Sequence, residues 1–562
     1  MKTTIVHLGL LLALAGGPAM ADAGDPPSRV ARLNYLSGPV SFRPGSVEDW
    51  AAASLNYPLT TGDHLWTDAG AQAEMHIGST ALRMAPETAL AFLNLDDRTV
   101  QLGLTQGSLH VRLRFLEPDE IFEVDTPSVS ISLVQPGDYR IDADGDHNLT
   151  IVAVRAGEAQ VNGGGAAFAV ESRQSAQISG LDSVTQEIGP LPPPNEFDNW
   201  CALRDRREEQ SISASHVGRE MTGYEDLDQY GAWRDVPGYD WVWVPQTVAV
   251  GWAPYRYGHW AWIEPWGWTW VDDAPWGFAP FHYGRWALVG GGWVWMPGAM
   301  VARPVYAPAL VAFVGGPRFG VSPAIGGGGV AAWFPLGPHE PYIPAYPVSA
   351  IYVRQVNIAH VAVTNINVVG VRYVNQNVAG AVTAVPHDAF VSARPVREVA
   401  IAVPPREMAQ AQVIGATAPL APRRESVLGG AVRGGGPPAR FADRPVVVRN
   451  APPPPPVSFA AQQRALEANP GRPLDPGTIN SLRGQGPPAR NPMVRSVAAA
   501  PAQRESFPRN DRPASAVATP RNAEQPRSSA QPARAEPRSD RPSKDSKPPK
   551  KPVKKPEPKD ER

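Results

Sequence analysis

The sequence predicts a mostly β protein in three parts: an N-terminal all-β domain of sandwich or short solenoid type, a tryptophan-rich module of β-hairpin repeats, and a long, disordered, proline-rich C-terminal region. Three observations lead to this prediction. Short segments of alternating apolar and polar residues recur between turn residues, tryptophan motifs repeat three times, and proline accumulates towards the C-terminus. With 52 basic and 54 acidic residues among 562, the chain is not uniformly basic, so we expect no nucleic-acid partner.

Residues 1–21 have the pattern of a secretory signal peptide. Lys2 precedes an apolar run from Ile5 to Ala15, and Ala19-Met20-Ala21 supplies the small residues that signal peptidase accepts. The run is too short to span a bilayer comfortably, and no later apolar stretch of about 18 residues is uninterrupted. We therefore expect an exported protein, periplasmic or else on the cell surface or secreted, with no transmembrane helix after the signal peptide. An uncleaved signal anchor is the alternative.

Residues 30–190 are predicted to form the N-terminal β domain. Apolar and polar residues alternate from Val100 to Leu104 and again from Leu109 to Leu113, and Gln106-Gly107 between them predicts the turn of a hairpin. Similar segments recur at a spacing of about 8 to 12 residues, which is typical of sandwiches, barrels and short solenoids. Further turns are expected at Gly62-Asp63, Gly78-Ser79, Gly137-Asp138, Asp144-Gly145 and Ala156-Gly157.

Several motifs in this domain resemble those of the FecR-like exported domain. They are Gly38-Pro39-Val40, Pro58 to Asp63, Ala71 to Ile77 with Gly78-Ser79, Gln106 to Leu109, Phe122 to Pro127 and Arg155 to Glu158. The resemblance implies a non-enzymatic β module, which in iron-transport regulators relays an outer-membrane signal to a sigma factor. Val134 to Gly137 stands where the family usually has an Arg-Gly-Thr turn. A signal-relay role is therefore kept as an alternative function.

Residues 195–230 are predicted to be a helical linker. Asn195 can cap a helix that runs from Glu196 to Glu209, because Phe197, Trp200 and Cys201 fall on one apolar face. Cys201 is the single cysteine of the chain, which excludes an internal disulfide and a zinc site built from several thiolates. Without a neighbouring base, we expect it to be a small core residue rather than a thiol switch.

Residues 231–350 are predicted to form the tryptophan-rich module, since 15 of the 17 tryptophans lie between Trp200 and Trp333. Tyr-Gly pairs begin at residues 230, 257 and 283, and Trp-x-Trp motifs begin at 241, 268 and 293. These near-constant spacings indicate a threefold repeat. Each unit is too short for a crossover between parallel strands, so each is most simply a β-hairpin. The run from Trp233 to Phe278 resembles an uncharacterised tryptophan-rich bacterial module that follows FecR-like domains, and it implies no activity.

The candidate ligand-binding residues lie in these repeats. Alternation places Trp260 and Trp262 on one face of a strand and Trp266, Trp268 and Trp270 on one face of the next, with Glu264-Pro265 as the turn. Exposed indoles would stack on sugar rings or on apolar side chains of a partner. The full set is Trp260, Trp262, Trp266, Trp268, Trp270, Trp293 and Trp295, with Asp272 and Asp273 at the rim. The alternative interpretation is that these indoles form the core of the module.

An enzymatic alternative places Glu264 or Asp273 as the acid of a carbohydrate-active hydrolase on the tryptophan surface. Against it, Asp272 and Asp273 are neighbours before Pro275, which is typical of a solvated turn. His259 and His282 lack a third histidine or thiolate at ligand spacing, so we expect no metal. No catalytic residue and no cofactor are assigned.

Two further segments complete the chain. Residues 351–390 are rich in valine and asparagine, including Thr364 to Val368, and predict one or two extended strands. Residues 391–562 are predicted to be disordered, apart from one short helix from Ala460 to Ala468. The tail from Arg541 to Arg562 carries seven of the eight lysines, alternating with proline, and is expected to contact anionic envelope surfaces or to act as a soluble tail.

The sequence as a whole predicts a non-enzymatic exported cell-envelope protein that acts by binding or scaffolding. Its expected partner is an envelope protein or an envelope polysaccharide. The alternatives are a glycan hydrolase and a component of an envelope signal relay.

Overall fold

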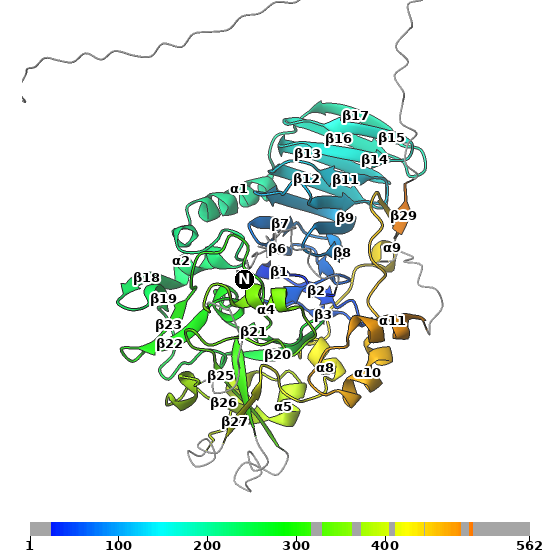
Figure 1. Cartoon of the computed structure of the whole chain (residues 1–562). Coiled ribbons are helices and arrows are strands. Elements are labelled where there is room, and N and C mark those ends of the chain that lie inside the picture. Colours follow the sequence, from blue (N-terminus) through cyan, green and yellow to red (C-terminus); the bar gives the residue numbers. More distant parts are fainter. Residues whose placement is uncertain are drawn as a thin grey trace, which may run out of the picture. The chain divides into compact units, whose positions relative to one another are not determined.

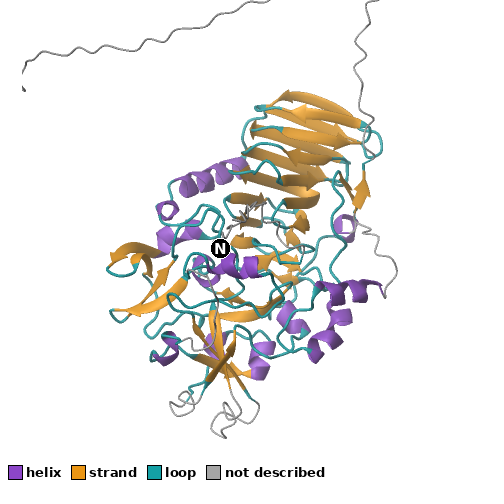
Figure 2. Ribbon diagram, in the orientation of Figure 1, coloured by secondary structure: helices purple, strands orange, loops and turns teal. Residues whose placement is uncertain are grey.

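A computed structural model describes residues 24–315, 329–361, 372–403, 411–442, 444–484 and 494–497 (Figure 1). These residues belong to one compact unit, which is mostly β (Figure 2). The predicted signal peptide and the basic tail lie outside the described residues. Among the helices of the described part, none is long and apolar enough to cross a bilayer.

Seventeen strands of the N-terminal domain form two sheets that share one long strand, β9 (Thr99–Leu113). Sheet A contains, in order, β4 (Pro58–Leu59), β1 (Ala31–Ser37), β6 (Gln72–Ile77), β7 (Thr80–Met84), β9, β12 (Gly137–Asp144), β13 (Leu149–Ala156), β16 (Gln174–Ser179) and β17 (Thr185–Pro190). Sheet B contains, in order, β3 (Ala51–Ala52), β2 (Val40–Arg43), β5 (His64–Thr67), β8 (Ala89–Leu95), β9, β10 (Ile121–Asp125), β11 (Ser130–Leu133), β14 (Ala159–Gly163) and β15 (Ala166–Val170). Side chains from both sheets belong to one buried core, as predicted for an all-β domain.

The hairpin turn predicted at Gln106-Gly107 is wrong, because β9 continues through it. Residues 99–106 pair with β8 or β10 in sheet B, and residues 107–113 pair with β7 and β12 in sheet A. Gly107 has φ +91°, and a Cβ there would collide with Thr88. Glycine is therefore needed where the strand passes from one sheet to the other, which a local turn signal does not distinguish from a hairpin.

The predicted helix after this domain is confirmed as α1 (Glu196–Glu209). Asn195 is its N-cap: its side chain accepts a hydrogen bond from the backbone N–H of Asp198, whose carboxylate accepts one from the backbone N–H of Asn195. Cys201 is buried, as expected, and burial raises the pKa of its thiol to about 12. The chain then passes through the short helices η1 (Ser213–Ser215), η2 (Tyr224–Asp226) and α2 (Leu227–Tyr230).

The three predicted repeats are three antiparallel hairpins. They are β18 (Gly231–Val236) with β19 (Asp240–Pro245), β20 (Gly258–Ile263) with β21 (Gly267–Asp272), and β22 (Arg285–Val289) with β23 (Gly292–Met296). The first and third hairpins join into a sheet of order β18-β19-β23-β22, and the second stands as a pair. A helix of one turn, α3 (Ala279–His282), connects the second hairpin to the third.

A further sheet has the order β26-β25-β24-β27 and follows the hairpins. Its strands are β24 (Val311–Gly315), β25 (Val330–Pro335), β26 (Thr383–Pro386) and β27 (Gln412–Gly415).

The extended segment predicted for residues 351–390 is mostly wrong where the structure describes it. A helix, α4 (Ala350–Asn357), begins the segment, and η4 (Asn375–Asn377) precedes β26. Ser349 caps α4, and the Asn357 side chain exchanges hydrogen bonds with the backbone of Tyr342 at 2.7 and 2.8 Å. The local cap and the contact between Asn357 and Tyr342, 15 residues apart, favour the helix over the strand that the valines suggest. Thr364 to Val368 lies outside the described residues.

Residues 391–497 contain short elements where the sequence predicts disorder. The helix α5 (His387–Val391) ends where this segment begins. The elements of the segment are α6 (Val396–Val399), α8 (Arg424–Val427), α9 (Ala439–Ala442), β28 (Val446–Val448), α10 (Phe459–Ala468), α11 (Pro476–Gly484) and β29 (Val494–Ser496), besides β27. The predicted short helix is confirmed as α10. Phe459, Leu466 and Val427 are buried in the common core, so this segment folds against surfaces that the other parts provide. The prediction of disorder for residues 498–562 concerns residues outside the description.

Candidate functional site

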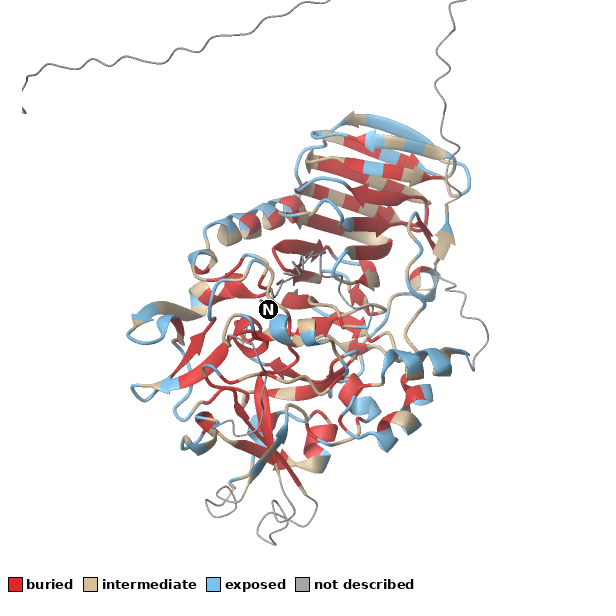
Figure 3. Ribbon diagram, in the orientation of Figure 1, coloured by how far each residue is buried: buried red, intermediate tan, exposed pale blue. Residues whose placement is uncertain are grey.

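The seven tryptophans predicted to bind a ligand are buried, and none exceeds 9% exposure. Figure 3 shows their strands as part of the buried interior. Trp260 packs against Trp270 with ring centroids 5.6 Å apart, and Trp262 packs against Trp268 at 5.4 Å, both edge to face. Such pairs add packing energy to the burial of large apolar surfaces. These seven indoles therefore form part of the core of the module. They do not form the exposed stacking face that the ligand-binding prediction required.

The predicted rim residues Asp272 and Asp273 have different environments. Asp272 is buried and accepts hydrogen bonds from the indole N–H of Trp270 and the backbone N–H of Ala274, both at 3.0 Å. Burial raises its pKa well above the usual range. Asp273 is exposed. The solvated turn predicted for both is thus wrong for Asp272, because the side chain of Asn56 ties this turn to the β domain through two backbone carbonyls at 2.8 and 2.7 Å.

Trp241 is exposed by 50%, whereas Trp268 and Trp293, its counterparts in the other repeats, are buried. It is the second residue of β19, after Asp240, and Tyr239 lies in the hairpin turn just before the strand. Sequence reasoning did not single it out. The available signal was the charge around it, since Arg234, Asp235 and Asp240 have no charged equivalents in the second hairpin.

Trp241 forms one wall of a surface groove of about 390 Å³, here called the Trp241 groove. Its lining includes Tyr239, Met300 and three histidines, His216, His339 and His360. Tyr239 and Met300 are 40% and 61% exposed. The His216 ring lies 4.6 Å from Trp241 and 4.4 Å from Trp233, which holds the exposed indole in place. The groove therefore combines the exposed apolar surfaces of Trp241, Tyr239 and Met300 with the polar side chains of three histidines and Asp240.

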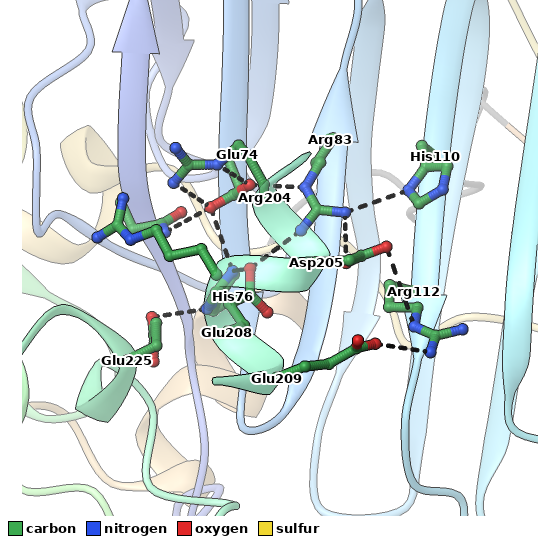
Figure 4. Close-up of polar contacts among 12 residues, drawn as sticks. Glu74, His76, Arg83, His110, Arg112, Arg204, Asp205, Glu208, Glu209 and Glu225 are labelled. Carbon is green, nitrogen blue, oxygen red and sulfur yellow. Dashed lines mark hydrogen bonds and ion pairs between the residues drawn. The ribbon is translucent and has the colours of Figure 1, made fainter. Parts of the chain in front are cut away.

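A network of buried charges joins sheet A to α1 and η2 (Figure 4). Arg83 on β7 contacts Glu74 at 2.6 Å, Asp205 at 2.9 Å and Glu208 at 3.0 Å, so strand, neighbouring strand and helix meet at one guanidinium. Arg204 on α1 makes a second, bidentate contact with Glu74. Arg83 and Glu74 are both fully buried. The network therefore fixes α1 on the sheet.

His76 and Arg32 extend this network to η2. His76 Nδ1 lies 2.6 Å from Glu225, and Arg32 lies 2.7 Å from Asp226. Burial alone would raise the pKa of Glu225, but His76 and Arg32 outweigh it and lower that pKa to about 2. Burial alone would lower the pKa of His76, but Glu225 and Glu208 hold it well above its usual value. His76 and Glu225 therefore stay charged at neutral pH.

Glu74, His76 and Glu208 lie close enough together to hold a metal ion. Arginine side chains already occupy their oxygens, and His76 is held in its protonated form, which does not ligate metals. The donor set therefore fits an ion-pair network better than a metal.

A second cavity, of about 460 Å³, lies at the contact between the β domain, the second tryptophan hairpin and the C-terminal segment. We call it the seam pocket. Its walls include Tyr57 and Asp63 of the β domain, Trp262 and Glu264 of the hairpin, and Pro456 of the C-terminal segment. Glu264, predicted as the acid of a hydrolase, thus lies in a pocket. Asp63 accepts backbone hydrogen bonds from Gly45 and Thr60 on both carboxylate oxygens, which commits it to a turn.

Comparison with known proteins finds one family model, a family of unknown function (DUF6600), which matches residues 224–340. This match covers the tryptophan hairpins. No curated protein matches the chain. Two crystal structures of a putative anti-sigma factor from Parabacteroides distasonis ATCC 8503, at 2.50 and 1.65 Å resolution, match with 11% and 10% identity and a TM-score of 0.20. Each match covers 22% of this chain and 58% of the other. The FecR-like resemblance stays a prediction.

Proposed function

We propose that this chain is an exported, non-enzymatic cell-envelope protein that binds a protein partner through the Trp241 groove. The observation that carries the proposal is the exposed indole of Trp241 in a module that buries its equivalents. Interfaces are enriched in tryptophan, tyrosine and methionine, and the residues that dominate binding energy are held rigidly at the centre of a groove. Trp241, Tyr239 and Met300 are residues of these types that line the groove, and His216 packs against the Trp241 ring.

The strand that carries Trp241 is anchored in the core by its next inward-facing tryptophan. Trp243, two residues after Trp241, is fully buried and donates its indole N–H to the carbonyl of Leu227 at 3.1 Å. Trp243 also lies opposite Trp295 across the sheet. Because little ordering is needed on binding, the exposed ring can contribute most of its contact energy to the complex. An apolar side chain of the partner, inserted between Trp241 and Met300, is the expected contact.

In vivo crosslinking tests this proposal. A photo-crosslinking amino acid in place of Met300, in the full-length chain expressed in its native host, is expected to capture a discrete protein partner. Trp241→Ala should abolish that adduct, and Leu288→Ala should keep it, since Leu288 is 40% exposed on another strand of the same sheet. Adducts that persist with Trp241→Ala, or none at all with normal export, would contradict the proposal.

The same experiment addresses the signal-relay alternative. If the captured partner is a membrane-spanning signalling protein, the relay role that the FecR-like resemblance implies gains support. A partner without a signalling domain favours a scaffold.

A further inference from the structure

We propose that the seam pocket binds a primary ammonium group, carried by a free organic amine or by a lysine side chain of a peptide. The inference concerns a different surface from the Trp241 groove and does not rest on the partner proposed there. Its volume of about 460 Å³ lies within the range of small-molecule sites.

The charge of the walls favours a cation. Four carboxyl groups line the pocket, those of Asp25, Asp63, Asp96 and Glu264. Within the described residues, none of them has an arginine, lysine or histidine nitrogen within 4.0 Å. Their hydrogen bonds come from neutral donors: Ser349 to Asp25, backbone N–H groups to Asp63, and Asn94 and backbone N–H groups to Asp96.

Two arginines also line the pocket. Arg29 is already paired with Glu120 at 3.0 Å and donates to the carbonyl of Asp96, and Arg483 donates to Asn480. Burial raises the pKa of Asp63 and of Glu264 to about 7. At pH 8 the charged carboxylates therefore outnumber the two arginines, one of which is neutralised from outside the pocket. A ligand cation would compensate the excess, and a ligand anion would add to it.

Four buried polar atoms of residues that line the pocket lack partners among the described residues: Oε1 of Glu264, the indole N–H groups of Trp262 and Trp266, and Nε of Arg483. The Trp262 side chain is only 2% exposed. An unpaired buried polar atom is costly, so a ligand that supplies the missing hydrogen bond gains affinity. An ammonium N–H matches Oε1, and a carbonyl of a peptide ligand matches the indole.

The remaining walls suit the apolar stem of such a ligand. Tyr57, Trp262, Trp266 and Tyr346 supply aromatic surfaces, which also attract cations through their ring faces. Pro456 and Pro473 of the C-terminal segment close the other side, and they approach Gly62 and Gly267 so closely that a Cβ at either glycine would collide with them. The C-terminal segment is therefore part of the pocket wall.

Titration calorimetry of the full-length mature chain at pH 8 tests the proposal. The probe is pentylammonium chloride, and pentan-1-ol is its neutral counterpart of similar shape. We expect saturable binding of the amine, no measurable binding of the alcohol, and at least a ~10-fold loss of affinity in Glu264→Gln, as for loss of one charged hydrogen bond. Glu171→Gln, at an exposed position outside the pocket, should bind as the parent does.

Three results would overturn the proposal: no saturable heat with the amine, equal binding of the alcohol, or unchanged affinity in Glu264→Gln. If Glu264→Gln does not fold by circular dichroism, Glu264→Asp, which retracts the carboxylate by one methylene, replaces it with the same expected loss. The peptide acetyl-Pro-Lys-Pro-amide distinguishes the two ligand sources. Tighter binding of the peptide than of pentylammonium assigns the site to lysine side chains, and the reverse assigns it to free amines.

Discussion

The contact between sheet A and α1 keeps its buried charges by pairing them, whereas the tryptophan-rich module buries ionisable groups without opposite charges. In the first region Arg83 contacts three carboxylates, and the pKa of Glu74 is held well below its usual range by Arg83 and His76 despite burial. In the second, burial lowers the pKa of His259 to about 4 and of His282 to about 3. The two regions should therefore lose different amounts of stability when an acidic group is replaced by its amide.

The difference shows two uses of polar groups in a large β protein. The paired network specifies which face of α1 meets the sheet, because any shift in register would leave a buried charge without a partner. The tryptophan module relies on ring packing and neutral hydrogen bonds, such as the one from His282 Nδ1 to the carbonyl of Ala307 at 2.8 Å. There, burial selects the uncharged form of each group.

The largest expected effect is the loss of one charge from the paired network. Glu74→Gln leaves Arg83 and Arg204 buried with too little negative charge, so the free energy of unfolding should fall by about 3 to 5 kcal/mol. Urea denaturation followed by circular dichroism measures it. A loss below about 1 kcal/mol would mean that the network is not a stabilising contact.

A smaller effect is expected from acidifying the tryptophan module. His282 has its folded pKa lowered from 6.5 to about 3, so the unfolded chain takes up a proton first as the pH falls below 6.5. Stability should therefore fall by about 2 kcal/mol between pH 7 and pH 5 from this residue alone. Over the same range Glu225 of the network stays charged, since its pKa is lowered to about 2.

Urea denaturation followed by tryptophan fluorescence at several pH values measures the slope of the unfolding free energy against pH. His282→Asn should flatten it, because an amide can still donate to Ala307 but does not titrate. An unchanged slope in the variant would contradict the assignment to His282.

Replacing a buried carboxyl group by its amide should lower the free energy of unfolding less in the tryptophan module than in the paired network. Asp272→Asn replaces a group that burial already favours in its neutral form. The asparagine has one acceptor fewer for the Trp270 indole N–H. We therefore expect the free energy of unfolding to fall by about 1 kcal/mol. Thermal unfolding of this variant beside Glu74→Gln makes the comparison, and equal losses would remove the distinction between the regions.

The smallest effect is expected at an exposed ion pair. Arg98 and Asp119 lie 3.9 Å apart and are both largely exposed, so Asp119→Asn should change the unfolding free energy by less than about 0.5 kcal/mol. A larger change would show that surface charges also contribute, and that burial is not what separates strong pairs from weak ones.

Much of the fold could be predicted from the sequence, and the candidate site largely could not. The period-two alternation predicts the strands of the β domain, and the repeat spacing predicts three tryptophan hairpins. Asn195 predicts the start of α1. For the Trp241 groove, the repeat made Trp241, Trp268 and Trp293 equivalent, and only the assembled sheet leaves the first of them exposed.

The sequence by itself determined the elements whose cause is local: alternation, turn residues, a capping side chain and a repeated motif. The tertiary structure decided the continuity of β9 through Gly107, the helix at residues 350–357, the short elements from α6 to β29 and the pairing of Arg83 with three carboxylates. Each of these depends on residues far apart in the chain. Burial and pairing of charge are properties of assembled surfaces, so no local pattern determines them.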